Sequence, residues 1–295
     1  MELVVVSGKG GTGKTSMVGS LAALSKNKVM VDCDVDAADL HLILSNKVQK
    51  TYEFIGGKQA SIINEKCTNC GICEEFCRFD AIKYDFYPAG QGDETFRIDK
   101  YACDGCGVCV HQCPEQAIAF NEVVSGQWFL SETPYGPLVH ARLGIAQANS
   151  GKLVSILRQK AKQLAAQHRM DMVLIDGPPG IGCPVIASIT GTGFVLIVTE
   201  PSLSAMHDME RLLQLTRHFG IRTGICINKC DINTDISSRI RDLAQGMDIP
   251  VLGQIRHDKA VIKAQLNRQS VVENGDSPAA KDIEKLWERI KEIIR

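Results

Sequence analysis

Eight of the twelve cysteines form two runs with the same spacing, C-x2-C-x2-C-x3-C. This spacing is typical of bacterial proteins that hold two [4Fe-4S] clusters, because three closely spaced thiolates of one run bind one cluster and the fourth binds the other. Zinc is the less favoured alternative, since zinc sites usually group their four ligands in pairs across a longer gap. The spacing therefore predicts two ligand sets: Cys67, Cys70, Cys73 and Cys113 for one cluster, and Cys103, Cys106, Cys109 and Cys77 for the other.

A glycine-rich loop near the N-terminus has the composition needed to bind phosphate. It follows an apolar strand, precedes a helical stretch and matches the pattern G-x-x-x-x-G-K-[ST]. Backbone N–H groups of such a loop converge on phosphate oxygens at the start of a helix. Lys14 should neutralise the outer phosphates, and the Thr15 hydroxyl should bind Mg²⁺. The predicted nucleotide-binding residues are Gly8, Lys9, Gly10, Gly11, Thr12, Gly13, Lys14 and Thr15.

Acidic residues follow two other apolar segments. Asp176 ends the segment that starts at Met172, and a Pro/Gly-rich turn comes next. Open α/β sheets bind ligands at the carboxyl ends of parallel strands, so we expect Asp176 to hold a Mg²⁺-bound water. Asp36 and Asp39, after the second strand, are predicted to be a solvated helix cap.

The elements that must position these residues are short apolar strands alternating with amphipathic helices. This alternation predicts an α/β fold with a mostly parallel sheet flanked by helices. A further helix should start within Asn149 to Lys152 and extend to about His168. The predicted strands are Leu3 to Val6, Val29 to Asp32, Met172 to Asp176, Phe194 to Thr199, Gly224 to Asn228 and Val251 to Ile255.

The cysteine repeat interrupts this alternation after the second strand and forms an insertion. Residues 58–122 contain 11 acidic and 6 basic side chains, a net charge of −5, whereas the rest of the chain carries a net charge of +4. We therefore expect three segments: 1–57 and 123–295 from a phosphate-loop domain, and 58–122 from the insert. Thr133 to Pro137 should form a rigid connector after the insert.

The loop sequence KGGTGKT and the later Val31-Asp32-Cys33-Asp34 resemble the MinD/ParA/Mrp family of P-loop ATPases. The resemblance implies an ATP-binding homodimer, or a heterodimer with a related ATPase, in which Lys9 reaches the partner's nucleotide. It further implies that Asp34 positions the attacking water and that Asp32 lies near Mg²⁺. Lys9, Lys14 and Asp34 are thus the expected catalytic residues.

Asn228 occupies the place where this family reads the base. It also begins the sequence Asn228-Lys229-Cys230-Asp231, which matches the N-K-x-D pattern that GTPases use for guanine. We expect ATP as the nucleotide and keep GTP as the alternative.

The insert resembles a bacterial 2[4Fe-4S] ferredoxin. A ferredoxin-type insert within a MinD-like ATPase resembles the MinD-superfamily ATPases that include those of the orange-protein complex. The resemblance implies ATP, Mg²⁺ and two [4Fe-4S] clusters as cofactors, and a redox or metallocluster protein as partner.

Cys183 lies seven residues beyond Asp176, in the segment equivalent to switch II of the family. One hypothesis pairs it with its copy across the dimer as a ligand of a transient metal or cluster. The alternative is a buried small hydrophobe, which is also our prediction for Cys33, Cys226 and Cys230.

Length, charge and hydropathy exclude several classes of protein. The chain has 295 residues, 33 Lys and Arg against 34 Asp and Glu, and 44% hydrophobic residues, which excludes a disordered chain and a polybasic nucleic-acid coat. No apolar run reaches the roughly 18 residues of a membrane span, and the N-terminus has no signal-like segment, so we expect a cytoplasmic protein. The apolar face of the C-terminal helix, from Ile283 to Ile294, should pack on the core, since its polar face has no basic excess for a membrane.

Three functions are compatible with this combination of motifs. In the first, ATP binding and hydrolysis control electron transfer from the two clusters to a partner. In the second, the protein assembles or carries a metal cluster. In the third and least favoured, it is a MinD/ParA-like positioning protein whose clusters sense redox state.

Overall fold

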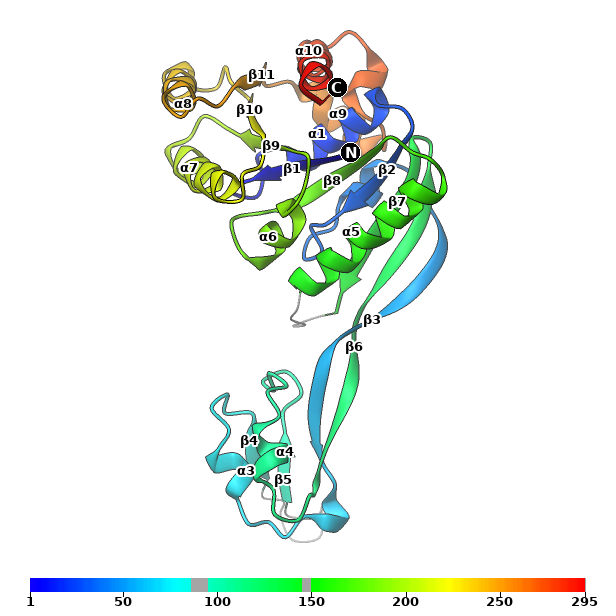
Figure 1. Ribbon diagram of the computed structural model, residues 1–295, viewed down its shortest axis with the longest axis vertical. Helices are drawn as coiled ribbons and strands as arrows, with labels where there is room; N and C mark the ends of the chain where they lie inside the picture. Colours follow the sequence, from blue (N-terminus) through cyan, green and yellow to red (C-terminus); the bar gives the residue numbers. More distant parts are fainter. Residues whose placement is uncertain (86–94, 145–149, 295) are drawn as a thin grey trace. The chain divides into compact units, whose positions relative to one another are not determined.

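The computed structural model describes residues 1–85, 95–144 and 150–294, which divide into two compact units (Figure 1). The first unit comprises Met1–Tyr52, Gln127–Leu143 and the chain from Ser150 onward, and the second comprises Glu53–Gly126 with the short segment that starts at Gly144. The boundaries after Tyr52 and after Gly126 fall inside long strands, β3 (Lys47–Ile62) and β6 (Ile118–Thr133). The predicted insert, 58–122, therefore starts and ends within strands and is a few residues shorter than the second unit.

The first unit is built on a mostly parallel sheet. Within the described residues the sheet has nine strands in the order β11-β10-β9-β1-β8-β2-β7-β6-β3, and the pairs from β11 to β7 are parallel. The predicted α/β fold and all six predicted strands are confirmed. These strands are β1 (Glu2–Ser7), β2 (Lys28–Asp32), β8 (Met172–Pro179), β9 (Phe194–Thr199), β10 (Thr223–Asn228) and β11 (Val251–Ile255).

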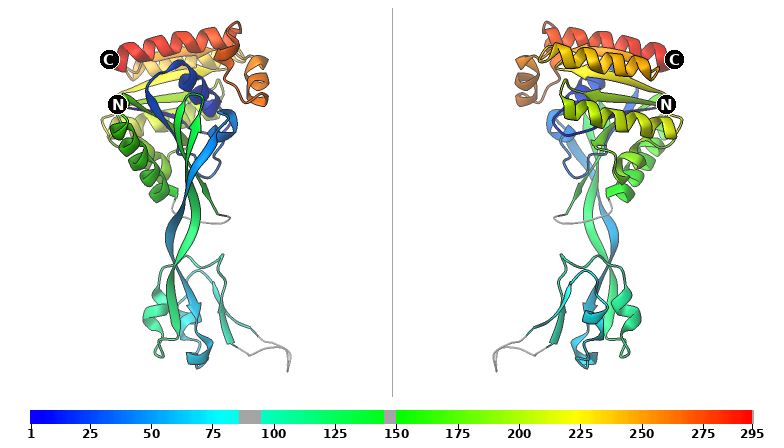
Figure 2. Two further views of the ribbon diagram at one scale, coloured as in Figure 1. Left: turned by 90° about the vertical axis from the view of Figure 1, so that its right-hand side faces the viewer. Right: turned by 90° about the vertical axis from the view of Figure 1, so that its left-hand side faces the viewer.

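Helices cover both faces of this sheet (Figures 1 and 2). Leu3 and Val5 of β1 share one core cluster with the helices of one face, and the alternate residues Val4 and Val6 are equally buried. Such strands are apolar on both sides because each face packs on helices. One face carries α1 (Lys14–Leu24), α2 (Leu40–Ile43), α9 (Lys259–Leu266) and α10 (Pro278–Ile294); the other carries α5 (Ser150–Gln167), α6 (Cys183–Ile189) and α7 (Leu203–His218). Helix α8 (Thr234–Gly246) connects β10 to β11, and the 3-10 turn η2 (Val271–Asn274) precedes α10.

Helix α10 packs on the core as predicted. Ile283, Leu286, Trp287 and Ile290 are buried in the cluster that contains α1 and β11 residues, and Figure 2 shows α10 (red) lying lengthwise along this unit. None of the helices in the described ranges has the length and apolar character needed to cross a membrane.

The structure describes two of the predicted connections. The predicted connector Thr133 to Pro137 is a tight turn between β6 and β7 (Gly136–Leu143), in which Thr133 Oγ1 donates to Gly136 O (2.8 Å) and accepts from Tyr135 N (3.1 Å). Helix α5 begins at Ser150, as predicted, while Asn149 lies outside the described residues.

The second unit has little regular structure. Strands β4 (Ile82–Asp85) and β5 (Thr95–Ile98) form an antiparallel pair, and the short helices are η1 (Asn64–Lys66), α3 (Ile72–Glu75) and α4 (Val108–Gln112). Its small core combines Ala60, Ile82, Phe96 and Ile118 with cysteine side chains from both runs. The cysteines are thus part of the packing of this unit.

A buried histidine of the first unit gives a prediction for stability against pH. The rings of His140 in β7 and His41 in α2 stack at 5.1 Å, and His140 Nε2 lies 2.9 Å from Ser131 Oγ. Burial, and to a smaller degree the neighbouring His41, lowers the pKa of His140 from 6.5 to about 4. His140 of the unfolded chain therefore binds a proton more readily than buried His140 does. The free energy of unfolding keeps its full value above about pH 6.5 and decreases as the pH falls towards 4.

We expect this histidine to account for on the order of 3 kcal/mol of the loss of unfolding free energy between pH 7 and pH 4. Denaturant titrations of the wild type and of His140→Gln, which keeps a polar group near Ser131, measure the difference. His168→Gln, in a residue that is exposed after α5, is the matched control. Equal pH slopes for the wild type and His140→Gln would contradict the prediction.

Candidate functional site

The phosphate loop joins β1 to α1 in the first unit. Gly13 caps the N-terminus of α1 with φ +88°, a conformation that favours glycine, and a Cβ at this position would collide with the Asn228 amide. Asn228 Nδ2 donates to Thr12 O at 2.7 Å. The loop is therefore held against the end of β10, which brings Asn228 next to the predicted nucleotide-binding residues.

Lys14 lies at the centre of the site and is buried. Its Nζ is 2.5 Å from Asp176 Oδ1, 3.5 Å from Asp34 Oδ2 and 3.4 Å from Thr15 Oγ1. Burial acts to lower the pKa of Lys14, but the charges of Asp176 and Asp34 outweigh it and raise the pKa above 10.5. Lys14 thus keeps its positive charge at neutral pH, and the fold brings Lys14, Thr15, Asp34 and Asp176 together.

Asp176 and Asp32 are neighbours across the β2–β8 pair, and both are fully buried. Burial is the main reason that the pKa of each carboxyl is raised. Asp32 accepts hydrogen bonds from the backbone N–H groups of Asp34 (3.1 Å) and Leu40 (3.0 Å), whereas Asp176 Oδ2 has no hydrogen-bond partner among the described residues. A buried carboxylate oxygen without a partner, close to a hydroxyl, fits a hard cation such as Mg²⁺.

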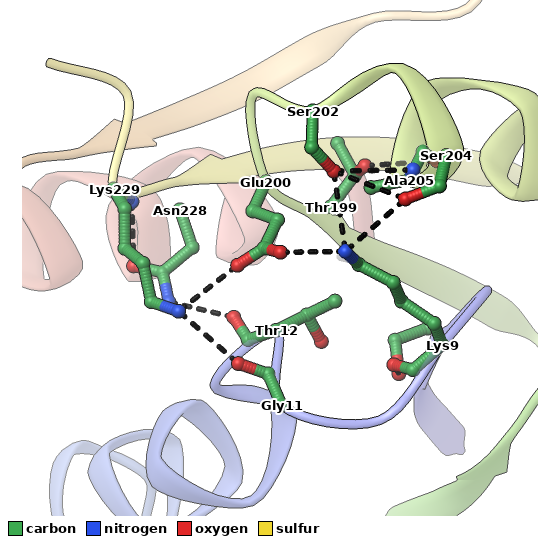
Figure 3. A network of polar contacts seen from close by, with 11 residues as sticks. Lys9, Gly11, Thr12, Thr199, Glu200, Ser202, Ser204, Ala205, Asn228 and Lys229 are labelled. Atoms are coloured by element: carbon green, nitrogen blue, oxygen red, sulfur yellow. Dashed lines mark hydrogen bonds and ion pairs between the residues drawn. The ribbon is translucent and has the colours of Figure 1, made fainter. Parts of the chain in front are cut away.

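Lys9 makes its contacts within the same chain (Figure 3). Its Nζ pairs with Glu200 Oε1 at 2.8 Å and lies 3.2 Å from Ser202 Oγ and 3.3 Å from Ser204 Oγ. Lys229 Nζ pairs with the other oxygen of Glu200 at 2.9 Å. Burial acts against ionisation of Glu200, but the hydrogen bonds from the two lysines outweigh it and lower its pKa.

Glu200 was missed by the sequence analysis. It follows directly after β9, and the prediction for Asp176 rested on the same kind of position, the end of an apolar strand segment. An acid at the carboxyl end of a parallel strand was therefore the signal that could have found it.

The residues after β10 form one end of the site. Lys229 Nζ also donates to Gly11 O at 3.1 Å, and Asp231 Oδ1 accepts from the backbone N–H of His257 at 2.7 Å. A cavity of about 560 Å³ runs from the phosphate loop past Asn228 to Ile262 of α9. This volume suits a nucleotide-sized ligand.

The second unit contains two cavities, each lined by four cysteines. The lining residues of both are otherwise largely apolar, and they include Phe96 in the first and Phe79 in the second. The cysteines are Cys67, Cys70, Cys73 and Cys113 in the first cavity and Cys77, Cys103, Cys106 and Cys109 in the second. The fold thus groups the thiols into the two sets that the spacing predicts, with one cysteine of each run in the other run's set.

The donor set and backbone of these cavities fit cluster binding. Four thiols in an apolar surrounding are the ligands that [4Fe-4S] clusters use. Gly105, between Cys103 and Cys106, has φ +69°, and a Cβ there would collide with Lys58 O. Burial raises the pKa of Cys73 to about 11, so a free thiol there is protonated at neutral pH. In the described residues, no three His, Cys, Asp or Glu side chains are arranged to hold a single metal ion.

The remaining cysteines differ in exposure. Cys183 is the first residue of α6 and is exposed, so the alternative of a buried hydrophobe is wrong for this residue. Cys33 and Cys226 are buried as predicted, and Cys230 is half-buried. A metal or cluster at Cys183 stays a prediction.

Comparisons with known proteins concern the whole chain. Residues 3–271 match the CobQ/CobB/MinD/ParA nucleotide binding domain. The chain is 34% identical to an uncharacterised protein of Methanocaldococcus jannaschii, MJ0578, over 100% of this chain and 98% of that protein. It is 22% identical to an uncharacterised ATP-binding protein of the same organism, MJ0547, over 96% of this chain and 84% of that protein.

A solved structure extends the comparison to three dimensions. The septum site-determining protein MinD of Pyrococcus horikoshii, complexed with Mg-ADP, has a TM-score of 0.59 at 17% sequence identity, and the match covers 99% of this chain and 96% of that chain. The structural match shows that the two chains share a fold, and at 17% identity we draw only this conclusion from it.

Proposed function

The chain belongs to the CobQ/CobB/MinD/ParA nucleotide-binding family, and on this premise we propose that it is a Mg²⁺-dependent ATPase that couples the nucleotide state of a dimer to electron transfer from two [4Fe-4S] clusters. The electrons would pass to a redox partner protein. The observation that carries the proposal is the presence, in one chain, of a phosphate loop around buried Lys14 and of two cavities with four cysteines each.

Three features support ATP as the nucleotide. The cavity beside the phosphate loop is large enough for a nucleotide, and related proteins are described as ATP-binding or were solved with Mg-ADP. Asp231 is hydrogen-bonded to the backbone of His257, and Lys229 is paired with Glu200. These contacts occupy two side chains of the guanine-type pattern, which favours ATP over the GTP alternative.

Hydrolysis requires a group that orients water and positive charge on the transferring phosphoryl group. Asp34 lies beside Lys14 and is the half-buried carboxylate that would accept a hydrogen bond from the attacking water. Lys14 would stabilise the negative charge that develops on the outer phosphate oxygens. Mg²⁺, held by Thr15 and Asp176 with Asp32 behind them, would neutralise further phosphate charge.

The proposed dimer requires Lys9 to leave its contacts within the chain. If Lys9 reaches the nucleotide of the partner subunit, its ion pair with Glu200 must break first. The Lys9–Glu200 ion pair of the single subunit therefore opposes formation of the proposed dimer.

We expect Glu200→Gln to lower the dissociation constant of the ATP-bound dimer by about fivefold, since a partly exposed ion pair contributes up to about 1 kcal/mol. Sedimentation of the Asp34→Ala protein with ATP, with and without Glu200→Gln, measures this change without turnover. Glu288→Gln removes a surface ion pair with Lys291 and is the matched control. A weaker dimer in the Glu200 variant would contradict the expectation.

The cysteine cavities support the redox half of the proposal. Each would hold one [4Fe-4S] cluster, which supplies one-electron transfer when bound. The thiols that line the cavities would bind as thiolates, so cluster binding releases protons that the free thiols hold.

The exposure of Cys183 favours one alternative, an ATP-dependent carrier or scaffold for metal clusters. The exposed thiol of Cys183, at the start of α6, is accessible to a transiently bound cluster. The buried thiol of Cys226 is not. In this alternative the clusters of the second unit would supply electrons or structural support.

One anaerobic experiment separates these functions. Iron content and the EPR spectrum of the dithionite-reduced protein are measured with and without MgATP and a chelator. About eight irons that resist chelation, with an EPR spectrum that changes on ATP binding, would support gated electron transfer. Additional iron that becomes labile with ATP would support the carrier, and ATP hydrolysis by a protein that binds no iron would overturn the redox proposal.

A further inference from the structure

The two cysteine cavities differ in the side chains that surround them. Phe76 and Val108 line the cavity of Cys77, Cys103, Cys106 and Cys109, and these two apolar side chains are 48% and 38% exposed. Cys106 itself is exposed. The exposed residues that line the other cavity are Thr68, Cys70 and Glu115, and no large exposed apolar side chain is among its described lining residues.

We propose that Phe76, Asp104, Cys106 and Val108, here called the Cys106 rim, form the docking surface for the redox partner, and that electrons leave through the cluster of this cavity. The inference rests on the proposed function, because it assumes that the cavity holds a cluster. It adds which of the two clusters faces the partner and what kind of partner fits.

The Cys106 rim has the composition of a protein interface. Phe76 directly follows α3 and Val108 begins α4, and these two short helices pack against each other. Two large apolar side chains exposed at one opening, beside polar residues, are typical of the centre of a protein contact. Because electron transfer slows steeply with distance, a partner that covers exposed Cys106 would receive electrons most rapidly from this cluster.

The acidic side chains around the Cys106 rim favour a partner with a basic surface. Asp104 is exposed and lines the same cavity, and Glu74 and Glu75 of α3 are exposed next to Phe76. Arg78 is the basic residue nearest in sequence, and its guanidinium lies over the ring of Phe79 at 4.9 Å. With a net charge of −5 over residues 58–122, the surface fits a redox protein with an apolar centre and a ring of lysines.

The transfer step moves one electron and no atoms. Cys77, Cys103, Cys106 and Cys109 would hold the cluster, which would give one electron to the one-electron acceptor of the docked protein, so that the cluster would be oxidised and the acceptor reduced. Dithionite supplies the electron in the experiment below.

Cytochrome c, a small basic protein with a partly exposed haem, serves as the probe. Its binding to the oxidised holoprotein is measured by calorimetry at low ionic strength, and its reduction by the dithionite-reduced, desalted protein is followed by stopped flow. We expect the double variant Phe76→Ser/Val108→Ser to weaken binding and slow reduction by about fivefold to tenfold at full iron content. Tyr101→Ser, which removes a side chain that is 63% exposed in the same unit but lines neither cavity, should change both by less than about twofold.

A charge variant keeps the test independent of packing around Phe76. Asp104→Lys should weaken cytochrome c binding and reduce its salt dependence, while Glu122→Lys, an exposed acid in β6, should have a smaller effect. Equal binding by wild type, rim variants and controls at full iron content would overturn this inference alone. An iron content near zero in the wild type would overturn the proposed function and the inference with it. Loss of self-association in the rim variants, at unchanged cytochrome c binding, would assign the rim to a second copy of this chain.

Discussion

Alanine in place of Lys14 is expected to reduce ATP hydrolysis by about 10³-fold or more while the iron content stays unchanged. Lys14 is the buried cation of the phosphate loop, and its side chain lies between Asp176 and Asp34. Its removal leaves the outer phosphates facing these two carboxylates without a compensating positive charge. Repulsion would then weaken ATP binding as well as raise the barrier to hydrolysis.

Phosphate release and nucleotide affinity should be measured together with iron content. Lys14→Met keeps most of the side-chain volume, so a loss of activity shared by the Met and Ala variants would come from the charge rather than from packing. Lys291→Ala, which removes a half-buried lysine at the surface of α10, is the control for an unspecific loss of charge. Normal hydrolysis by the Lys14 variants would show that the phosphate site is assigned to the wrong loop.

The phosphate loop could be predicted because its determinants are local. Gly13 and Lys14 are adjacent in the sequence, and the strand before them and the helix after them follow from short apolar patterns. The contacts that hold the loop in place were beyond the sequence. Asn228 reaches Thr12 because the sheet brings the end of β10 close to the loop, and no local sequence pattern predicts this long-range contact.

The strands that connect the two units were missed for a different reason. Most residues of β3 are exposed, with Phe54, Ile55 and Ala60 among few apolar positions, so the alternation that marks a half-buried strand is weak. β3 pairs with β6, which lies more than fifty residues away in sequence. Sheet pairing across that distance is set by the fold and not by local propensity.

The ion pair between Lys9 and Glu200 could not be predicted from the resemblance to the family. The family pattern implies a role for Lys9 in a dimer, and it gives no information on the contacts of Lys9 in the single subunit. In the structure one carboxylate, Glu200, holds both Lys9 and Lys229 (Figure 3). Three charged residues from distant parts of the chain meet because three strands end at the same edge of the sheet.

The grouping of the cysteines was predicted from spacing alone, since three cysteines of each set lie within seven residues. The fourth cysteine of each set was expected from the other run, and each cavity is indeed lined by three cysteines of one run and one of the other. The repeat could be interpreted because each run carries its own turn, with Gly71 and Gly107 at the starts of α3 and α4. What the sequence left open was that exposed apolar side chains, Phe76 and Val108, line only one of the two cavities among the described residues.

Cys106→Ala is expected to remove one cluster, lowering the iron content from about eight to about four per chain, and to leave ATP affinity unchanged. Cys106 is exposed, so its truncation opens no hole in the core and the loss of iron would come from the missing ligand. The other four thiols line a separate cavity, so the cluster that we propose there should remain bound. EPR of the reduced variant should then show one isolated cluster, without the spin coupling of two neighbouring clusters.

Cys70→Ala and Cys183→Ala complete the comparison, because all three replaced cysteines are exposed. Cys70→Ala should remove the other cluster, and the cluster that remains should differ in reduction potential from the one that remains in Cys106→Ala. Cys183→Ala should keep about eight irons. Loss of all iron in either single cluster variant would mean that the clusters stabilise each other through α3, α4 and the small core they share. Loss of none would show that the exposed thiols are not ligands, and the cysteine runs would then need another role.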